Sequence, residues 1–378
     1  MEKCRVAKIC GGCQLQGVEY DRQLQRKQEY VEKLYSHYQV RPIIGMDDPY
    51  NYRNKVQVAF GRANGRVICG NYVTSTHQIV EIKDCQITDR KANEIIEDIR
   101  KLIISFRLTV FDENAMKGFL RHVLIRTGHV SGQVMVVLVT GSYQFPKKKD
   151  FIDALLKKHP EITTVVQNIN SAHTSMVLSE KSITLYGKGY IEDVLCEKVF
   201  RISANSFYQV NSVQTEKLYS AAIKMAQLEK NDTIIDAYCG IGTIGISIAG
   251  KVRQVLAVEI NKQAIRDARV NAKLNDVETI GFSAMDAGKF MRKLAYEKTQ
   301  VDVIIMDPAR AGADEPFLSS LVKLKPRKVV YISCNPDTQR RDISYLNSHG
   351  YKVEELQPVD MFPFTEHVES IALLERNR

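Results

Sequence analysis

The second half of the chain contains apolar, β-branched runs that each end at a residue able to carry chemistry. Residues 329–334 read Val-Val-Tyr-Ile-Ser-Cys and stop at an Asn-Pro pair, where a strand cannot continue. A second run ends at Asp307, and a third opens into the Gly-rich turn 236–243. Ligands bind at the carboxyl ends of strands in open α/β sheets, so we expect these groups on adjacent strand ends. A cofactor turn, a carboxylate and the Cys334 thiol together favour a transferase that uses covalent catalysis.

The fold class follows from a change of pattern near residue 200. From there, strands alternate with helices of ten or more residues, which is typical of βαβ units and a parallel sheet. We therefore expect an α/β protein with a Rossmann-like domain over residues 201–378. A β-rich central α+β domain is expected over 91–200, and a cysteine-bearing segment with the start of that central domain over 1–90.

Local patterns predict further elements before residue 200. Helices are expected over 21–38 and 92–105, a half-exposed strand over 52–60, and a hairpin of 118–126 with 132–140. The run Lys147-Lys148-Lys149 is typical of a solvated helix start, with RNA contact as the alternative.

Composition narrows the class of protein. Hydrophobic residues make up 44% and charged residues 26%, as in ordinary globular proteins. No apolar run reaches the ~20 residues of a membrane span, and no signal-peptide core is present, so we expect a cytoplasmic location. The net charge of +9 favours a polyanionic partner, and 17 Tyr and 13 Phe could stack on bases. A basic enzyme without such a partner is the alternative.

Three of the eight cysteines crowd the N-terminus as C-x5-C-G-G-C, with a fourth further along. The four are Cys4, Cys10, Cys13 and Cys85. Four thiolates suit tetrahedral zinc or an iron–sulfur cluster, and one tight pair instead of two favours the cluster. Unliganded cysteines that pack as small hydrophobic residues are the alternative.

The turn that begins at Asp236 could serve a dinucleotide or S-adenosylmethionine. Later strands lead to further acids, at Glu259, Asp286 and Asp307. A carboxylate at the second strand end accepts hydrogen bonds from ribose hydroxyls. No basic residue occurs over 236–250 to meet a pyrophosphate, so the acids favour a cationic sulfonium cofactor over NAD. Each acid could instead be a helix cap.

Taken together, these motifs resemble the RNA uracil-5-methyltransferase family, which makes 5-methyluridine in ribosomal and transfer RNA. The resemblance covers nearly the whole chain. It rests on the cysteine cluster, Phe207-Tyr208-Gln209-Val210-Asn211, the Asp-x-Tyr-Cys-Gly-x-Gly-Thr turn, Asp307-Pro308-x-Arg310, Ser333-Cys334-Asn335-Pro336 and His367-Val368-Glu369.

The resemblance implies a class I Rossmann-like S-adenosylmethionine methyltransferase domain with an N-terminal iron–sulfur segment. Cys334 would be the nucleophile and Glu369 the general base. The residues alone fit Glu369 equally well to an exposed acid at the start of the last strand. The resemblance also implies a [4Fe–4S] cluster on Cys4, Cys10, Cys13 and Cys85. The S-adenosylmethionine ligands would be Gln209, Tyr238, Thr243, Glu259, Asp286 and Asp307.

The chain departs from the family pattern in two places. Ala309 stands where the family usually has a second proline, and Cys4 lies too near the start for a preceding N-terminal RNA-binding barrel. Members with a cluster and no barrel resemble the enzymes of 23S ribosomal RNA, which is the expected substrate. The T-loop uridine of transfer RNA and a non-catalytic RNA-binding module are the alternatives, and a Rossmann oxidoreductase is disfavoured. We expect a monomer.

Overall fold

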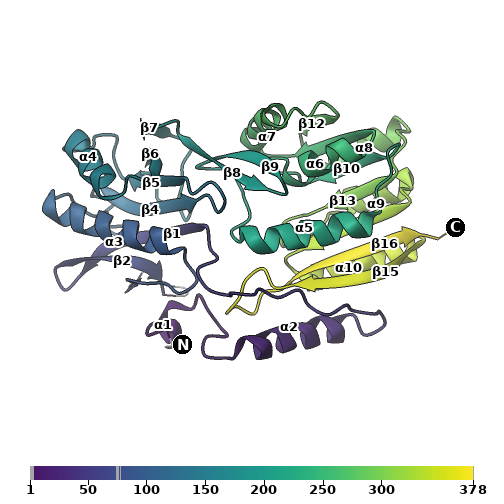
Figure 1. Cartoon of the computed structure of the whole chain (residues 1–378), viewed down its shortest axis with the longest axis horizontal. Coiled ribbons are helices and arrows are strands. Elements are labelled where there is room, and N and C mark those ends of the chain that lie inside the picture. Colours follow the sequence, from purple (N-terminus) through teal and green to yellow (C-terminus); the bar gives the residue numbers. More distant parts are fainter. Residues whose placement is uncertain (1–3, 74–75, 77, 378) are drawn as a thin grey trace. The chain divides into compact units, whose positions relative to one another are not determined.

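The structure is a computed structural model that describes residues 4–73, 76 and 78–377. The chain divides into two compact units. The first comprises Met1–Gly17, Pro49–Val194 and Arg201–Asn205, and the second comprises Val18–Asp48, Leu195–Phe200 and Ser206–Arg378. Figure 1 labels the elements of both. The division into three segments at residues 90 and 200 stays a prediction.

The first unit is built on a seven-stranded mixed sheet. Its strand order is β3 (Ile79–Glu81), β2 (Arg66–Tyr72), β1 (Lys55–Ala63), β4 (Leu120–Thr127), β5 (Val134–Thr140), β6 (Ile162–Ile169) and β7 (Ser182–Tyr186). β5 and β6 run parallel, joined through α4 (Lys148–Lys158), and the other neighbours run antiparallel. The predicted hairpin is confirmed as β4–β5. The predicted lysine-rich helix start is also confirmed, with Lys147 at the N-cap of α4.

Helices cover the apolar face of this sheet. Besides α1 (Ala7–Cys10), the unit contains α3 (Arg90–Ser105), which confirms the helix predicted over 92–105. Ile99 of α3 and Phe151 of α4 join Val123 and Val136 of the sheet in one buried cluster. β8 (Tyr190–Leu195) and β9 (Lys198–Ser203) form a separate two-stranded sheet.

The second unit is built on another seven-stranded sheet, as the βα alternation predicted. Its order is β12 (Ile280–Ala284), β11 (Gln254–Glu259), β10 (Thr233–Ala237), β13 (Val303–Met306), β14 (Lys328–Ser333), β16 (Glu369–Arg376) and β15 (Tyr351–Val359). The first five strands are parallel, and β16 runs antiparallel to both β14 and β15.

The helices of the second unit follow the strands in the alternating manner of a Rossmann-like fold. They are α2 (Tyr20–Leu34), α5 (Ser212–Ala226), α6 (Thr243–Ile248) with the short 3-10 helix η1 (Ala249–Lys251), α7 (Lys262–Leu274), α8 (Ala287–Tyr296), α9 (Glu315–Leu324) and α10 (Pro336–Ser348). α10 begins at Pro336. Proline is well tolerated at the first helical position, because the N–H that it lacks would have no partner within the helix there. The strand-breaking Asn-Pro therefore also starts the next helix.

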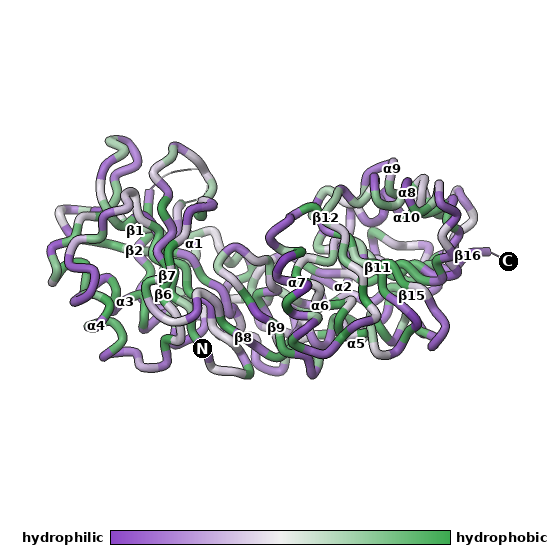
Figure 2. Tube along the Cα trace, turned by 90° about the horizontal axis from the view of Figure 1, so that it is seen from above, coloured by the Kyte–Doolittle hydropathy of each residue, from purple (hydrophilic) through white to green (hydrophobic). Residues whose placement is uncertain are grey.

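The main core of the second unit joins helices from distant parts of the sequence. Val31 and Tyr35, near the end of α2, pack with Met291 of α8, Phe317 of α9 and the strands β13 and β14. The apolar strands are visible as green stretches of the tube in Figure 2. Helix α2 thus packs on the C-terminal sheet, although it lies far from that sheet in the sequence. Among the residues that the structure describes, no helix is long and apolar enough to cross a membrane.

Candidate active site

Most of the predicted site residues lie at one edge of the second unit's sheet. Tyr238, Glu259, Asp307 and Cys334 stand at or directly after the carboxyl ends of β10, β11, β13 and β14. The register pairs Ala237 with both Val258 and Met306, so the strand ends are level with one another. The parallel sheet therefore brings these four side chains to one edge, as expected from the sequence.

The Gly-rich turn has an unusual backbone. Tyr238, Gly240 and Gly242 have φ values of 64°, 54° and 85°, in the left-handed region that glycine tolerates best. Glu259 holds this turn with both carboxylate oxygens engaged. Its Oε2 accepts from the Gly240 N–H at 3.3 Å, and its Oε1 accepts from the Asn261 N–H at 2.8 Å. Glu259 thus links the turn after β10 to the start of α7.

A second carboxyl group, on Asp236, holds the helix α6 that follows this turn. It is 1% exposed, and its Oδ2 accepts from the Gly245 N–H of α6 at 2.8 Å. Burial, followed by the charges of Asp307 and Glu259, raises the pKa of Asp236 to about 7. Thr243, the first residue of α6, shares a hydrogen bond of 3.1 Å with the Tyr219 hydroxyl.

The remaining predicted cofactor residues lie on the flanking segments. Asp286 is the N-cap of α8, where its Oδ1 accepts from the Lys289 N–H at 2.9 Å. The helix-cap interpretation of this acid is therefore confirmed. Gln209 is buried and stands two residues before Asn211, the N-cap of α5.

Glu369 lies beside Cys334 because of strand direction. β14 and β16 are antiparallel, and Ser333 pairs with Ser370. The residues one step further, Cys334 and Glu369, therefore face each other at the end of the ladder. Glu369 is 3% exposed, so the interpretation of it as an exposed acid is wrong. The thiol of Cys334 is half-buried.

The electrostatics of these groups are coupled. Burial, and then the charges of Glu369 and Asp307, raise the pKa of the Cys334 thiol to about 11, while Arg310 lowers it. Burial and Asp307 raise the pKa of Glu369 well above its usual value, and Arg310 opposes them. Asp307 keeps some exposed surface, but the dense protein around its carboxyl group raises its pKa to about 7. The two acids and the thiol thus disfavour one another's ionisation.

No role was predicted from the sequence for Arg310, although it acts electrostatically on both Cys334 and Glu369. Its side chain is exposed, and its carbonyl oxygen accepts from Asn335 Nδ2 at 3.0 Å and Thr338 Oγ1 at 3.1 Å. These bonds fasten the loop after β13 to the start of α10. Its place three residues after Asp307, in the same motif, could have identified it.

The four N-terminal cysteines lie in the first unit. Burial raises the pKa of the Cys13 thiol to about 12, with further contributions from Cys85, Cys10 and Cys4. The fold therefore brings the thiols of Cys4, Cys10 and Cys85 within electrostatic reach of Cys13. Within the described ranges, however, no three His, Cys, Asp or Glu side chains are grouped closely enough to hold a metal ion.

The buried carboxyl of Asp236 predicts a pH dependence of stability. Its pKa is about 7 in the folded protein against 3.8 for a free side chain, so the folded state binds more protons over this range. The free energy of unfolding should then fall as pH rises from about 4 to 7. In Asp236→Asn this slope should be shallower by up to about 1.4 kcal/mol per pH unit. Urea unfolding at several pH values measures it, with the exposed Asp21→Asn as control. Equal slopes in wild type and Asp236→Asn would contradict the assignment.

Comparisons with known proteins agree with this geometry. The sequence profile of the tRNA (Uracil-5-)-methyltransferase family matches residues 19–377. An uncharacterized RNA methyltransferase of Oceanobacillus iheyensis is 42% identical over 372 residues, which cover 97% of this chain and 81% of that protein. A similar protein of Halalkalibacterium halodurans is 42% identical over 378 residues, covering 98% of this chain and 82% of that protein.

A solved structure resembles the fold over nearly its full length. The tRNA (uracil-54, C5)-methyltransferase of Pyrococcus abyssi, in complex with S-adenosyl-L-homocysteine, superposes with a TM-score of 0.82 at 28% sequence identity. The match covers 96% of this chain and 85% of that one. The chain therefore belongs to the tRNA (Uracil-5-)-methyltransferase family and is an RNA methyltransferase.

Proposed function

We propose that the protein methylates C5 of a uridine in 23S ribosomal RNA, with S-adenosylmethionine as methyl donor, and gives 5-methyluridine. The observation that carries the proposal is the placement of buried Glu369 opposite Cys334, beside Asp307. Methylation of an exocyclic amine needs neither a thiol nor a second carboxylate. A non-catalytic RNA-binding module would not need a buried acid next to a thiol, since such burial destabilises the fold.

The proposed chemistry divides between these two side chains. C5 of uracil is a weak nucleophile, so the Cys334 thiolate adds to C6 and moves an electron pair into an enolate, which makes C5 nucleophilic. C5 then forms the new bond to the methyl carbon, in exchange for the bond that held this carbon to the donor's sulfur, which keeps the electron pair and leaves as a neutral thioether. Glu369 removes the C5 proton, and the thiolate leaves C6 as the double bond returns. Arg310 favours the thiolate in this site, since it lowers the pKa of Cys334.

We propose that the cofactor lies along the carboxyl edge of β10–β13. S-adenosylmethionine, when bound, supplies a methyl group on a cationic sulfonium. The proposed ligands are Gln209, Tyr238, Thr243, Glu259, Asp286 and Asp307. The charges of Asp307 and Glu259 already raise the pKa of Asp236, and a nearby cation would relieve that repulsion. The left-handed turn at 238–242 leaves backbone close to where a ligand would lie.

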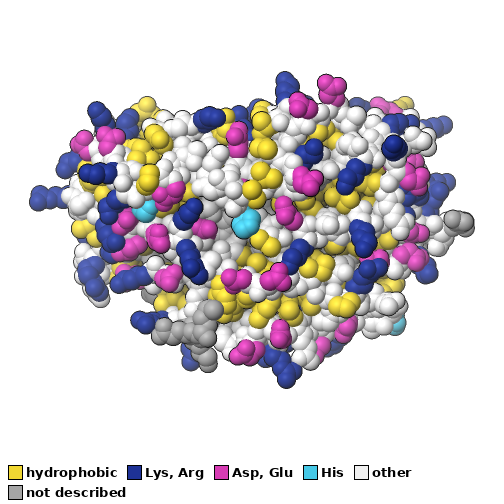
Figure 3. Space-filling view, viewed as in Figure 1, with side chains coloured by type: hydrophobic (Ala, Val, Ile, Leu, Met, Phe, Trp, Pro, Cys, Tyr) yellow, Lys and Arg dark blue, Asp and Glu magenta, His cyan; other side chains and the backbone are white. Residues whose placement is uncertain are grey.

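The choice of 23S ribosomal RNA rests on the four-cysteine segment of Cys4, Cys10, Cys13 and Cys85. A second candidate is the T-loop uridine of transfer RNA, which the similarity to the Pyrococcus abyssi enzyme favours. The net charge of +9 suits either RNA. On the face drawn in Figure 3, Lys and Arg side chains are interspersed with Asp and Glu, so surface charge gives no preference there. The target uridine must be unstacked to reach Cys334.

We also propose that Cys4, Cys10, Cys13 and Cys85 hold a [4Fe–4S] cluster. Four half-buried thiols, three of which act electrostatically on Cys13, are a suitable donor set. Around one zinc ion, with Zn–S near 2.3 Å, tetrahedral sulfurs would lie only about 3.8 Å apart. In a cluster each cysteine binds a different iron, so its ligands are more widely spread. The absence of a compact ion site among the described residues is therefore compatible with a cluster. A cluster would cross-link the N-terminal segment to the strand region around Cys85.

The function is tested by Cys334→Ala together with RNA mapping. Mass spectrometry should find 5-methyluridine in 23S ribosomal RNA of cells with the protein and not without it, and the transfer RNA T-loop tests the second candidate. Cys334→Ala should abolish methylation yet bind S-adenosylmethionine within about twofold of wild type, because the thiol is not among the proposed ligands. RNA containing 5-fluorouracil should trap a covalent adduct only with the wild type, since C5 then has no proton to lose. An equally stable adduct with the Ala variant would refute the nucleophile.

Removing the proposed base should separate methyl transfer from release. Glu369→Gln keeps the shape but cannot take the C5 proton, so methylated RNA should remain attached to Cys334 and survive a denaturing gel. The carboxylate acts within roughly 3 Å of C5 or through one water. Radiolabelled methyl groups followed on the gel give the readout. Full turnover by the Gln variant would rule out the role, and loss of both methylation and adduct would indicate that Glu369 positions the uracil.

Metal content tests the cluster. Anaerobically purified protein should be brown and contain about four irons per chain. Cys10→Ser should lose the iron and destabilise the first unit before it affects cofactor binding by the second. If the protein instead contains one tightly bound zinc and no iron or sulfide, the cluster proposal is wrong and the cysteines form a zinc site.

A further inference from the structure

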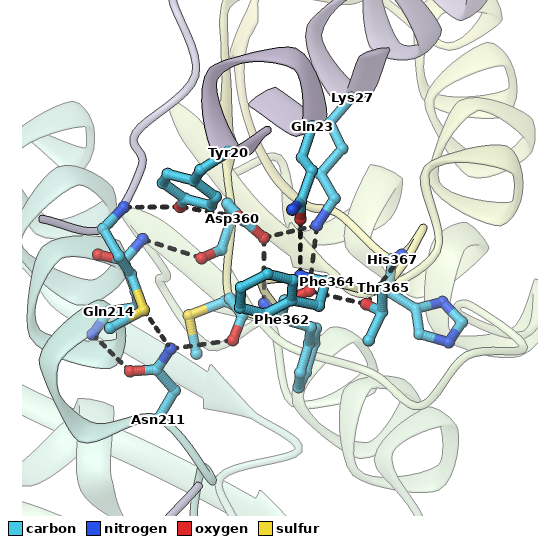
Figure 4. Close-up of polar contacts among 12 residues, drawn as sticks. Tyr20, Gln23, Lys27, Asn211, Gln214, Asp360, Phe362, Phe364, Thr365 and His367 are labelled. Atoms are coloured by element: carbon cyan, nitrogen blue, oxygen red, sulfur yellow. Dashed lines mark hydrogen bonds and ion pairs between the residues drawn. The ribbon is translucent and has the colours of Figure 1, made fainter. Parts of the chain in front are cut away.

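The 360–368 connection joins β15 to β16 and ends at Glu369, the proposed base. Buried polar contacts hold it from two sides. From α2, Lys27 Nζ donates to Asp360 Oδ1 at 2.6 Å and to the Phe362 carbonyl at 3.1 Å. Gln23 Oε1 accepts from the Phe364 N–H at 2.8 Å. Figure 4 shows these side chains reaching from α2 onto the connection.

From the other side, the start of α5 holds the same connection. Asn211 Nδ2 donates to the Met361 carbonyl at 3.0 Å, and Gln214 Nε2 donates to the Asp360 carbonyl at 3.0 Å. Asn211 and Gln214 lie two and five residues after Gln209, a proposed cofactor ligand. Backbone carbonyls of the connection thus accept hydrogen bonds from side chains of both α2 and the start of α5.

Lys27 is the charged member of this arrangement. The side chains of Lys27 and Asp360 are 2% and 0% exposed, and Tyr20 donates a further bond to Asp360 Oδ2 at 2.9 Å. A buried ion pair adds little stability over an apolar pair of similar shape, so such pairs are best explained by the conformation that they specify. Here the ammonium group bridges two points of the connection, the Asp360 side chain and the Phe362 backbone. No apolar side chain could make that bridge.

We infer that Lys27 is a positioning residue for Glu369. Its bridge fixes the 360–368 connection, and the connection sets where the first residue of β16 meets the uracil. This inference rests on the proposed function. The Lys27 bridge goes to Asp360 and Phe362 of the connection that leads to Glu369, so it bears on proton removal from C5 and not on methyl transfer.

Lys27→Met tests the inference through the step at which the reaction stops. Turnover should fall about tenfold or more, while KM for S-adenosylmethionine stays within about twofold. Radiolabelled, methylated RNA should accumulate as a covalent adduct on a denaturing gel, as for Glu369→Gln. Gln25→Ala, on the exposed side of the same helix, is the matched control and should behave like wild type. Unchanged turnover in Lys27→Met, or a loss without adduct, would overturn the inference.

Two further variants separate positioning from folding. Lys27→Met combined with Asp360→Asn removes both buried charges, so it should regain the wild-type thermal midpoint yet still accumulate adduct, because nothing bridges to Phe362. Recovery of full turnover along with the midpoint would overturn the inference. If Lys27→Met fails to fold, Lys27→Arg carries the test. It keeps the charge but holds its donors in a planar fork, so adduct should again accumulate, and normal turnover would count against positioning.

The wild type distinguishes this inference from the proposed function. If wild-type protein forms no 5-methyluridine on ribosomal or transfer RNA, the proposed function fails. If the wild type methylates RNA and Cys334→Ala does not, while the Lys27 variants turn over normally, only the positioning role fails.

Discussion

The antiparallel direction of β16 is the constraint on which the candidate active site depends. The first residue of a parallel strand lies at the amino edge of the sheet, far from where β14 ends. Because β16 runs the other way, its first residue, Glu369, comes to the edge where Cys334 follows β14. The reversed direction of β16 thus brings the Glu369 carboxyl group next to the Cys334 thiol at the end of β14.

This arrangement has an electrostatic consequence. Asp236, Asp307 and Glu369 are enclosed by protein, and each carboxyl group has a raised pKa. Arg310 opposes these shifts at Cys334 and Glu369, from an exposed position on the loop after β13. The site therefore combines acids that resist ionisation with the exposed cation of Arg310. Such perturbed groups are typical of functional sites.

Local sequence patterns predicted where strands end. They did not predict which strands that are distant in the sequence pair with each other. The runs ending near Asp307 and Cys334 were predicted because β-branched residues and proline act within a few positions. The burial of Glu369 could not be derived from its neighbours, since it depends on the direction of β16 relative to β14.

Two other features also lay beyond the local pattern. Periodicity predicted the helix over 21–38, which ends earlier, at Leu34, but gave no sign of which sheet its apolar face would join. The role of Asp286 as a helix cap was an open alternative, because an acid before a helix fits a cap and a ligand equally well.

The place of α2 in the second unit has a consequence for how the chain is made. Lys27 leaves the ribosome well before its partner Asp360, which lies 333 positions later. Residues 49–194 belong mainly to the first unit and emerge between them. Domains tend to fold in order during synthesis, so the first unit can complete its sheet before the strands on which α2 packs have been made. The core of the second unit contains residues from both α2 and β16, so it cannot form until β16 has been made. A chain that terminates before β16 therefore leaves the apolar face of α2 exposed. Such truncated chains become targets for aggregation or degradation.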